Sequence, residues 1–226
     1  MKIKNKEIYS LLLYVYRSIR DKYLYYRRLP YLKQLRNFLG ADTSIISSNC
    51  FAGRIMQDLQ MEYKSPTLGL WIMPDDFAVF CGDLKHYLNS NIKIVEHSKN
   101  KLGEYKMTHP PKHSYPVGWI DDKLEVHFLH YHTAEEAISK WRRRAERVNY
   151  KNLLLVGSEQ NGCTEEDVKA FDSIPYGKKL YFCSHPYPYK SVVYIKEFAK
   201  LGHVGDPYKK GHVLYKYLYK WLKENH

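Results

Sequence analysis

The feature that most constrains this chain is a change of pattern after Gly40, where a long helical stretch gives way to short apolar runs that alternate with helical segments. Such alternation is typical of α/β units that surround a largely parallel sheet. We therefore predict an α/β protein with a Rossmann-like three-layer α/β/α core, a mostly parallel sheet, a β-hairpin insertion, and helical N- and C-terminal appendages. The predicted strands are 44–47, 67–73, 92–96, 152–157, 180–184 and 191–196, with a hairpin at 117–120 and 124–131, and the predicted helices are 53–60, 74–88, 133–148, one from Thr164, and 207–222.

Basic charge is concentrated in residues 1–39. This segment holds ten Lys or Arg against Glu7 and Asp21, so ten minus two gives it +8 of the formal net charge of +12. Apolar residues recur every three or four positions over 5–29, which predicts an amphipathic helix that stops at Leu29–Pro30, before a short helix at 31–39. We predict a basic helical arm at 1–39, an α/β core at 40–205, and a C-terminal helix at 206–226 packed on the core.

Cysteine usage and the lack of a long apolar run indicate a cytoplasmic protein. The four cysteines lie far apart without a Cys-x-x-Cys pair, and the start of the chain lacks a signal-type cleavage site, so reduced thiols are expected. The apolar run at 11–16 is far shorter than the roughly 20 residues that cross a bilayer. Peripheral contact of residues 1–39 with the inner face of an anionic membrane is compatible with this location.

Four loops are expected to hold the functional site. In open α/β sheets, ligands bind beyond the carboxyl ends of the strands, where helix N-termini attract negative charge. The rule selects residues 47–53, 73–76, 158–164 and 184–187, all rich in small polar side chains. No glycine fingerprint of the dinucleotide or P-loop kind is present, so the sequence identifies no cofactor.

The first of these loops is the most suggestive. Ser48, Asn49 and Cys50 lead directly into a helix that contains Gly53 and Arg54. We predict that Ser48, Asn49, Gly53 and Arg54 bind a phosphate or carboxylate. A helix N-terminus lowers the pKa of a thiol, which makes Cys50 a candidate nucleophile. The alternative is that Ser48 or Asn49 caps the helix and Cys50 is a small buried apolar residue.

Asp75 and His130 are the candidate catalytic bases. Asp75 lies in a first helical turn, where acidic residues are also ordinary partners of the helix dipole. His130 belongs to a cluster with His127 and His132 that suggests a metal site at first. On a strand, however, His127 would point to the face opposite the other two, so we predict no metal and histidines held by hydrogen bonds.

The loop after residues 152–157 supplies Ser158, Asn161 and Cys163 as further predicted ligand-binding residues. The alternative is an ordinary loop that caps the next helix. A nucleophilic pair of Cys50 or Cys163 with His127 or His185 also stays open, because such partners meet only in the folded chain.

The helix predicted at 133–148 combines an aromatic anchor with clustered arginines. Trp141 is expected to hold it on the core. Most of the arginines are expected on a solvated face, with one of them able to reach an anionic ligand. They are Arg142, Arg143, Arg144 and Arg147.

Several motifs in one order make this sequence similar to a known family. They are Ile45–Cys50, Ser65–Leu70, Tyr115–Gly118, His127–Tyr131, Trp141 with Arg144 and Arg147, Asp172, and Ser191–Ile195. Together they resemble the bacterial domain of unknown function 1919 family over roughly residues 42–205. Its members are often labelled exopolysaccharide or capsule biosynthesis proteins, which implies a surface-glycan pathway but supplies no catalytic residue to carry over. The family pattern matches Asn49, Cys50 and Gly53 and has Asn in place of Ser48.

The leading hypothesis is therefore a transferase of exopolysaccharide assembly that uses a phosphate-bearing sugar donor or a lipid-linked acceptor. In it the backbone of 49–53 holds the phosphate, Arg54 assists, and Asp75 or His130 is the base. The alternative is a non-catalytic basic module, or adaptor, that binds nucleic acid or an anionic membrane surface through residues 1–39. Nucleic acid is the less favoured partner, because zinc-finger spacing, an aromatic RNA-recognition signature and a helix-turn-helix are all missing.

Overall fold

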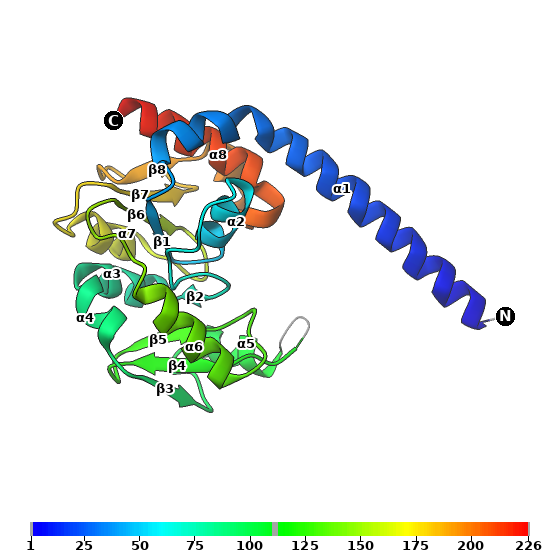
Figure 1. Ribbon diagram of the computed structural model, residues 1–226, viewed down its shortest axis with the longest axis horizontal. Helices are drawn as coiled ribbons and strands as arrows, with labels where there is room; N and C mark the ends of the chain where they lie inside the picture. Colours follow the sequence, from blue (N-terminus) through cyan, green and yellow to red (C-terminus); the bar gives the residue numbers. More distant parts are fainter. Residues whose placement is uncertain (1, 110–112, 226) are drawn as a thin grey trace.

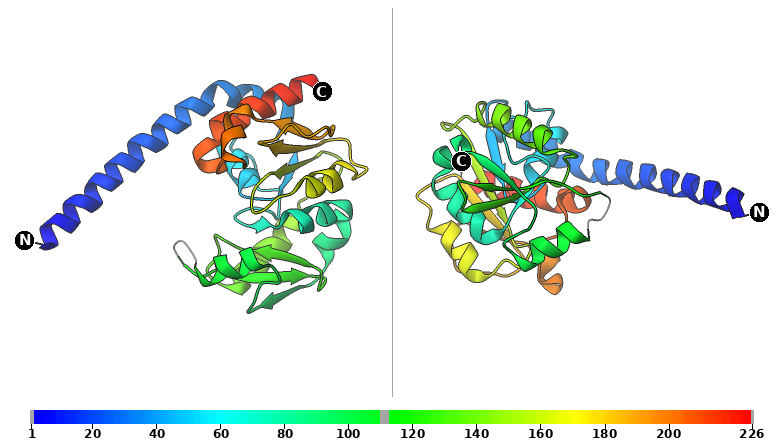
Figure 2. Two further views of the ribbon diagram at one scale, coloured as in Figure 1. Left: turned by 180° about the vertical axis from the view of Figure 1, so that it is seen from behind. Right: turned by 90° about the horizontal axis from the view of Figure 1, so that it is seen from below.

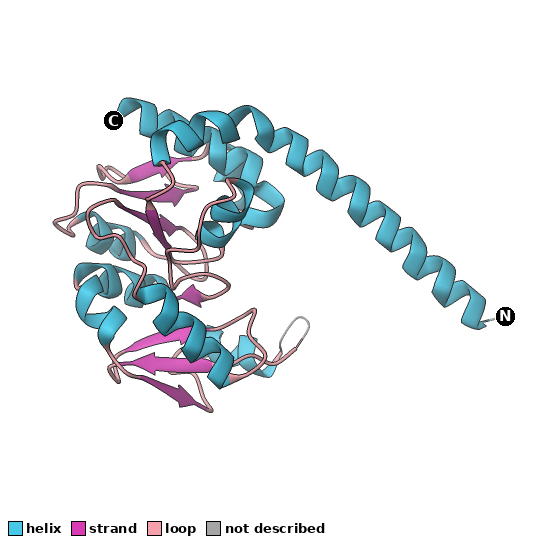
Figure 3. Cartoon of the chain, in the orientation of Figure 1, coloured by secondary structure: helices cyan, strands magenta, loops and turns pink. Residues whose placement is uncertain are grey.

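The chain folds into two four-stranded β-sheets surrounded by helices in the computed structural model, which describes residues 2–109 and 113–225 (Figure 1). The parallel sheet contains, in spatial order, β1 (Ser44–Ser47), β6 (Leu153–Ser158), β7 (Lys179–Cys183) and β8 (Val192–Tyr194). The antiparallel sheet contains β2 (Trp71–Ile72), β5 (Leu124–His127), β4 (Val117–Ile120) and β3 (Ile92–Val95). Figure 3 shows the strands in these separate groups. The α/β class is confirmed.

The α-helices follow the predicted order with three differences. They are α1 (Lys2–Leu39), α2 (Phe51–Asp58), α3 (Pro74–Gly82), α4 (Leu84–Asn89), α5 (Lys101–Thr108), α6 (Ala134–Ala145), α7 (Glu165–Asp172) and α8 (Pro207–Glu224), with a 3₁₀ helix at Lys196–Leu201. The single helix predicted at 74–88 is interrupted at Asp83, whose side chain accepts a hydrogen bond from the His86 amide at the start of α4. Helix α5 was not predicted, and α1 continues through Pro30.

The parallel sheet is buried on both faces, as its apolar strands require. Successive residues of β1 point to opposite sides. Ile45 packs with residues of α2, α8 and the end of α1, whereas Ile46 packs with residues of α3 and α7. Strand β6 alternates in the same way, with Leu154 on the first side and Leu155 on the second. Helices therefore cover both faces and leave the carboxyl ends of the strands as the open edge.

The prediction of one mostly parallel sheet is wrong for the segments at 67–73 and 92–96. The hairpin β4–β5 forms at the predicted turn, but its second strand ends at His127 and not at 131. Asp121 and Asp122 in the turn have positive φ angles of 54° and 52°. Strand β2 pairs antiparallel with β5, and β3 pairs antiparallel with β4. A hairpin forms locally and has two free edges, with which neighbouring short strands can pair. Apolar runs alone do not specify which sheet such a strand joins.

Helix α1 is a single helix that leaves the body of the molecule (Figure 2). Leu32, Leu35 and Leu39 are buried on its last turns, which pack on α8. This packing holds the segment after Pro30 helical, although proline removes one backbone hydrogen bond. Within the described residues, no helix is long and apolar enough to cross a bilayer.

Candidate functional site

A cavity of about 630 Å³ lies beyond the carboxyl ends of β1 and β6. We call it the central cavity. The loops after β1 and β6, the antiparallel sheet, α5 and the start of α8 all contribute to its wall. The lining residues are Asn49, Cys50, Trp71, Lys106, Leu129, His130, Gln160, Asn161, His203, Asp206, Pro207 and Tyr208. Four residues predicted from the sequence, Asn49, Cys50, His130 and Asn161, therefore share one cavity.

The turn after β1 is held by its own side chains. Ser47 Oγ accepts a hydrogen bond from the Ala52 amide at 2.9 Å, and Asn49 Oδ1 accepts one from the Phe51 amide at 2.9 Å. These bonds occupy two amides that a phosphate at the helix start would use. Ser48 is buried, and its amide donates to Val156 O of β6. Asn49 Nδ2 donates to Gln160 Oε1 at 2.7 Å, so this side chain joins the two predicted loops.

The thiol of Cys50 is protonated rather than activated. Burial raises its pKa to about 12, and the nearby Asp206 carboxylate acts in the same direction. The predicted lowering of this pKa by the helix N-terminus is therefore wrong, because desolvation of a thiolate outweighs a partial dipole charge. Cys50 lines the central cavity as an apolar surface, with Sγ 3.8 Å from the Leu70 carbonyl oxygen.

Arg54 is not among the residues that line the central cavity. Its guanidinium donates two hydrogen bonds to Asp58, at 2.7 and 3.1 Å. Arg28 of α1 pairs with the same carboxylate, with Nε 2.7 Å from Oδ2. Arg54 also lies over the ring of Tyr208, 5.2 Å from its centroid. Arg54, predicted to assist phosphate binding, instead packs on Tyr208, which lines the cavity.

In the loop after β6, only one of the three predicted residues faces the central cavity. Asn161 has a positive φ of 56°, and its Oδ1 accepts a hydrogen bond from Lys106 Nζ at 2.6 Å. Ser158 is buried at the end of β6. Cys163 lies 3.3 Å from the Tyr181 hydroxyl, and burial raises its pKa to about 12.

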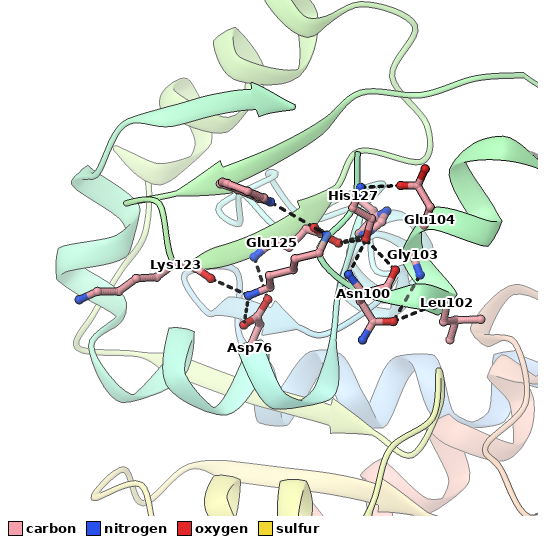
Figure 4. Close-up of polar contacts among 11 residues, drawn as sticks. Asp76, Asn100, Leu102, Gly103, Glu104, Lys123, Glu125 and His127 are labelled. Carbon is pink, nitrogen blue, oxygen red and sulfur yellow. Dashed lines mark hydrogen bonds and ion pairs between the residues drawn. The ribbon is translucent and has the colours of Figure 1, made fainter. Parts of the chain in front are cut away.

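Asp75 does not line the central cavity, and its buried neighbour Asp76 belongs to a structural network (Figure 4). Asp76 accepts hydrogen bonds from Lys99 Nζ and from the Glu125 amide, each at 2.8 Å. Asp75 is exposed in the first turn of α3. This position fits the alternative role of Asp75, in which its carboxylate interacts with the dipole of α3.

Glu125 is the centre of that network and is fully buried. Its carboxylate accepts hydrogen bonds from Ser98 Oγ, the Lys99 amide, Trp119 Nε1 and His127 Nε2, at 2.5, 2.8, 3.1 and 2.7 Å. Burial alone would raise the pKa of Glu125, but these donors, His127 first among them, lower it to about 2. An ionised carboxylate therefore fixes the His127 ring.

The ring of His127 supports Trp71, which lines the central cavity. It stacks on Trp71, with centroids 3.9 Å apart and an angle of 19° between the planes. Lys106 Nζ lies 4.4 Å from the Trp71 centroid, and burial lowers the pKa of this amine. Sequence reasoning missed Lys106 and Trp71, because α5 has no clear apolar period and β2 pairs through only two residues. The run Asn100–Glu104, with Asn100 as the N-cap, was the available signal for α5.

The remaining candidate histidines are held in different places. His127 pairs with Glu125, and His185 Nδ1 lies 2.5 Å from Glu159 Oε1, so each has a glutamate rather than a cysteine as its partner. The ring of His132 packs against His113. The described residues contain no group of three or more His, Cys, Asp or Glu that could hold a metal ion.

The chain is similar to a known protein and to a known family. A protein of Haemophilus influenzae, described as an uncharacterized protein, is 36% identical over 172 residues, which covers 76% of this chain and 76% of that protein. The family model described as "Domain of unknown function (DUF1919)" matches residues 25–223. The match includes the end of α1 and nearly all of α8, which the sequence motifs had left outside. This chain belongs to the DUF1919 family.

Proposed function

We propose that this protein is a transferase of surface-glycan assembly that binds a phosphate-bearing sugar in the central cavity. The lining of that cavity carries the proposal. The side-chain amides of Asn49, Gln160 and Asn161 bond within the protein, but each keeps a further N–H and a further oxygen lone pair for hydroxyl groups, and Lys106 adds a cation. The ring of Tyr208, exposed by 39%, offers a flat apolar surface. A cavity of this size suits a sugar derivative, since ligand pockets are commonly about 300–1,000 Å³.

Two further arguments support the proposal. We interpret the parallel sheet, covered by helices on both faces, as a Rossmann-like core, in which ligands bind beyond the carboxyl ends of the strands. The polysaccharide labels implied by the family resemblance point to the same class of substrate.

His130 is the residue to which we assign proton transfer, because it is the predicted base that lines the central cavity. In this reaction a hydroxyl oxygen of the acceptor attacks the anomeric carbon of the donor. The bond from that carbon to the phosphate oxygen breaks, and the phosphate-bearing group leaves with the electron pair. The proton of the acceptor hydroxyl passes to the imidazole of His130.

Substitution of Lys106 tests the proposal. Nucleotide sugars are expected to raise the melting temperature of the wild-type chain, because they bind the folded state. Lys106→Met, which keeps the length of the side chain and removes its charge, is expected to weaken that binding by about tenfold or more. Lys101→Met is the matched control, because Lys101 is exposed on the same helix. Binding would be measured by thermal shift and titration calorimetry, and turnover by release of the nucleoside diphosphate. If nucleotide sugars leave the wild-type chain unchanged, or both variants bind equally, the proposal is wrong.

We further propose that α1 brings the protein to an anionic membrane surface, where lipid-linked acceptors lie. Ile8, Leu12, Val15 and Ile19 are exposed and share one side of the helix at three- and four-residue spacing. The period places Arg17 on the opposite side. Exposed apolar side chains on a basic helix fit an interfacial helix, and the charge of +8 over residues 1–39 favours anionic lipid over a second copy of the same basic helix.

Two matched double variants test the membrane contact. The wild-type chain is expected to cosediment with phosphatidylglycerol vesicles and far less with phosphatidylcholine vesicles. Leu12→Glu with Ile19→Glu is expected to reduce this binding by about tenfold or more, because two carboxylates enter the apolar stripe. Val79→Glu with Leu201→Glu changes the charge equally at exposed apolar positions on the body and is expected to bind like wild type. Equal binding of both double variants would contradict the proposal, as would an effect of the α1 variant on oligomeric state alone.

A further inference from the structure

A second, smaller hollow of about 270 Å³ adjoins the central cavity. His130 and Tyr208 line both spaces and form the boundary between them. We call the smaller space the Arg144 hollow. Its lining residues are Gly53, Gln57, Tyr63, Leu68, Gly69, His130, Tyr131, Lys140, Arg144 and Tyr208. In the described structure this lining contains two cationic side chains and no acidic one.

Arg144 is held in place by aromatic residues rather than by a carboxylate. Its Nη1 donates a hydrogen bond to the Tyr131 hydroxyl at 2.5 Å, and that hydroxyl donates to the Leu68 carbonyl at 2.6 Å. The guanidinium also lies 5.7 Å from the centroid of the Tyr63 ring. A guanidinium with a neutral hydroxyl and a ring as its partners keeps its positive charge available for an anion.

The position of Arg144 follows from the anchoring of α6. Trp141 is buried, as predicted, against Phe80 and Phe128, whereas Arg143 is exposed. The helical period therefore turns Arg144 toward the hollow. Lys140, one turn earlier, lies near the Tyr131 ring, and Glu136 pairs with its amine at 2.5 Å. Arg144 is thus the cation of the hollow without an acidic partner of its own in the described residues.

Gly53 lines the Arg144 hollow and adds no side chain to it. A Cβ built at this position would lie 3.7 Å from Leu68 and 3.9 Å from the Tyr208 hydroxyl, both ordinary contact distances. Packing therefore does not require glycine here, and glycine is a poorer helix residue than alanine. The missing side chain instead leaves space beside the Tyr208 hydroxyl. Burial raises the pKa of Tyr208 to about 12, so this hydroxyl remains a hydrogen-bond donor.

We propose that the Arg144 hollow is an anion subsite that binds the phosphate or diphosphate group of the sugar donor. This inference rests on the proposed function for the identity of the donor. The sugar occupies the central cavity and its phosphate group the Arg144 hollow, so the bond that breaks lies near the boundary formed by His130 and Tyr208. Arg144, rather than the predicted Arg54, neutralises the leaving group.

Binding of inorganic pyrophosphate to the full chain tests the subsite directly. Titration calorimetry is expected to show binding by the wild-type chain. Arg144→Gln is expected to weaken it by about tenfold or more, because a charge-assisted bidentate contact is lost. Arg143→Gln removes the same charge from the neighbouring exposed position and is expected to bind like wild type. Lys106→Met is also expected to retain pyrophosphate binding, since Lys106 lines only the central cavity of the two spaces.

Gly53→Ala is a second test of the subsite, for the case in which Arg144→Gln disturbs the packing of Tyr131. Alanine fits the site and favours the helix, so its melting temperature should equal or exceed that of wild type. Its added methyl group narrows the hollow, and we expect weaker pyrophosphate binding. The subsite is wrong if the wild-type chain does not bind pyrophosphate, if Arg144→Gln and Arg143→Gln bind alike, or if Lys106→Met alone loses binding. Pyrophosphate binding that depends on Arg144 without any response to nucleotide sugars would uphold the subsite and contradict the transferase.

Discussion

Glu125→Ala is expected to lower the free energy of unfolding by about 3–5 kcal/mol, the usual effect of removing one partner from a buried charged network. The substitution removes the acceptor of the buried His127 ring and of the half-buried Ser98 and Trp119 side chains. Urea unfolding at neutral pH measures the change. Glu146→Ala is the control, because Glu146 is exposed, and it should stay within about 0.5 kcal/mol of wild type. A Glu125→Ala chain as stable as this control would contradict the network's role.

The same carboxylate predicts a pH dependence of defined sign. The folded pKa of Glu125 is about 2, below its ordinary value of 4.5. A depressed folded pKa contributes stability above the unfolded value, and this contribution is lost as the pH falls toward the folded value. The stability difference between wild type and Glu125→Gln should therefore be constant above pH 5 and shrink between about pH 4.5 and 2. A difference that does not change over this range would contradict the assignment.

Asp58→Ala is expected to lower the free energy of unfolding by about 3–5 kcal/mol, because it leaves buried charges without their partner. Asp58 accepts from two arginines, and from the Tyr215 hydroxyl at 2.9 Å. Burial lowers the pKa of Arg28, which shows that its environment already disfavours the charge before the carboxylate is removed. Denaturant unfolding measures the loss. Asp21→Ala breaks the exposed pair with Arg20 on the same helix, and its effect should be about 1 kcal/mol or less.

The sequence predicted the edge of the sheet that holds the cavity better than it predicted the cavity wall. Asn49 and Asn161 were found because they follow β1 and β6, and the rule for parallel strands needs only local patterns. Lys106 and Trp71 come from a helix without clear periodicity and a two-residue strand, whose positions depend on the antiparallel sheet. Tyr208 was expected only as part of a terminal helix, and no local pattern relates it to β1.

The roles of individual residues were harder to predict than their positions. The pKa of Cys50 was argued from the helix that follows it, but burial by distant segments decides the outcome. Arg54 was placed beside a ligand because it follows Gly53, yet Asp58 lies one turn later and pairs with it. That i,i+4 pairing was visible in the sequence.

The shared carboxylate of Asp58 has a practical consequence for dividing this chain. Arg28 contacts Asp58, Asp58 contacts Arg54, and Arg54 lies against Tyr208 in the cavity wall. Deleting all of 1–39 would therefore strip a counter-charge from the body and loosen the wall at the same time. A shorter deletion that ends before Arg20 spares the α1 residues that line a hollow with Arg54 and Tyr208. Such a deletion removes the exposed apolar stripe together with Lys2, Lys4, Lys6 and Arg17, and leaves the contacts of α1 with the body in place.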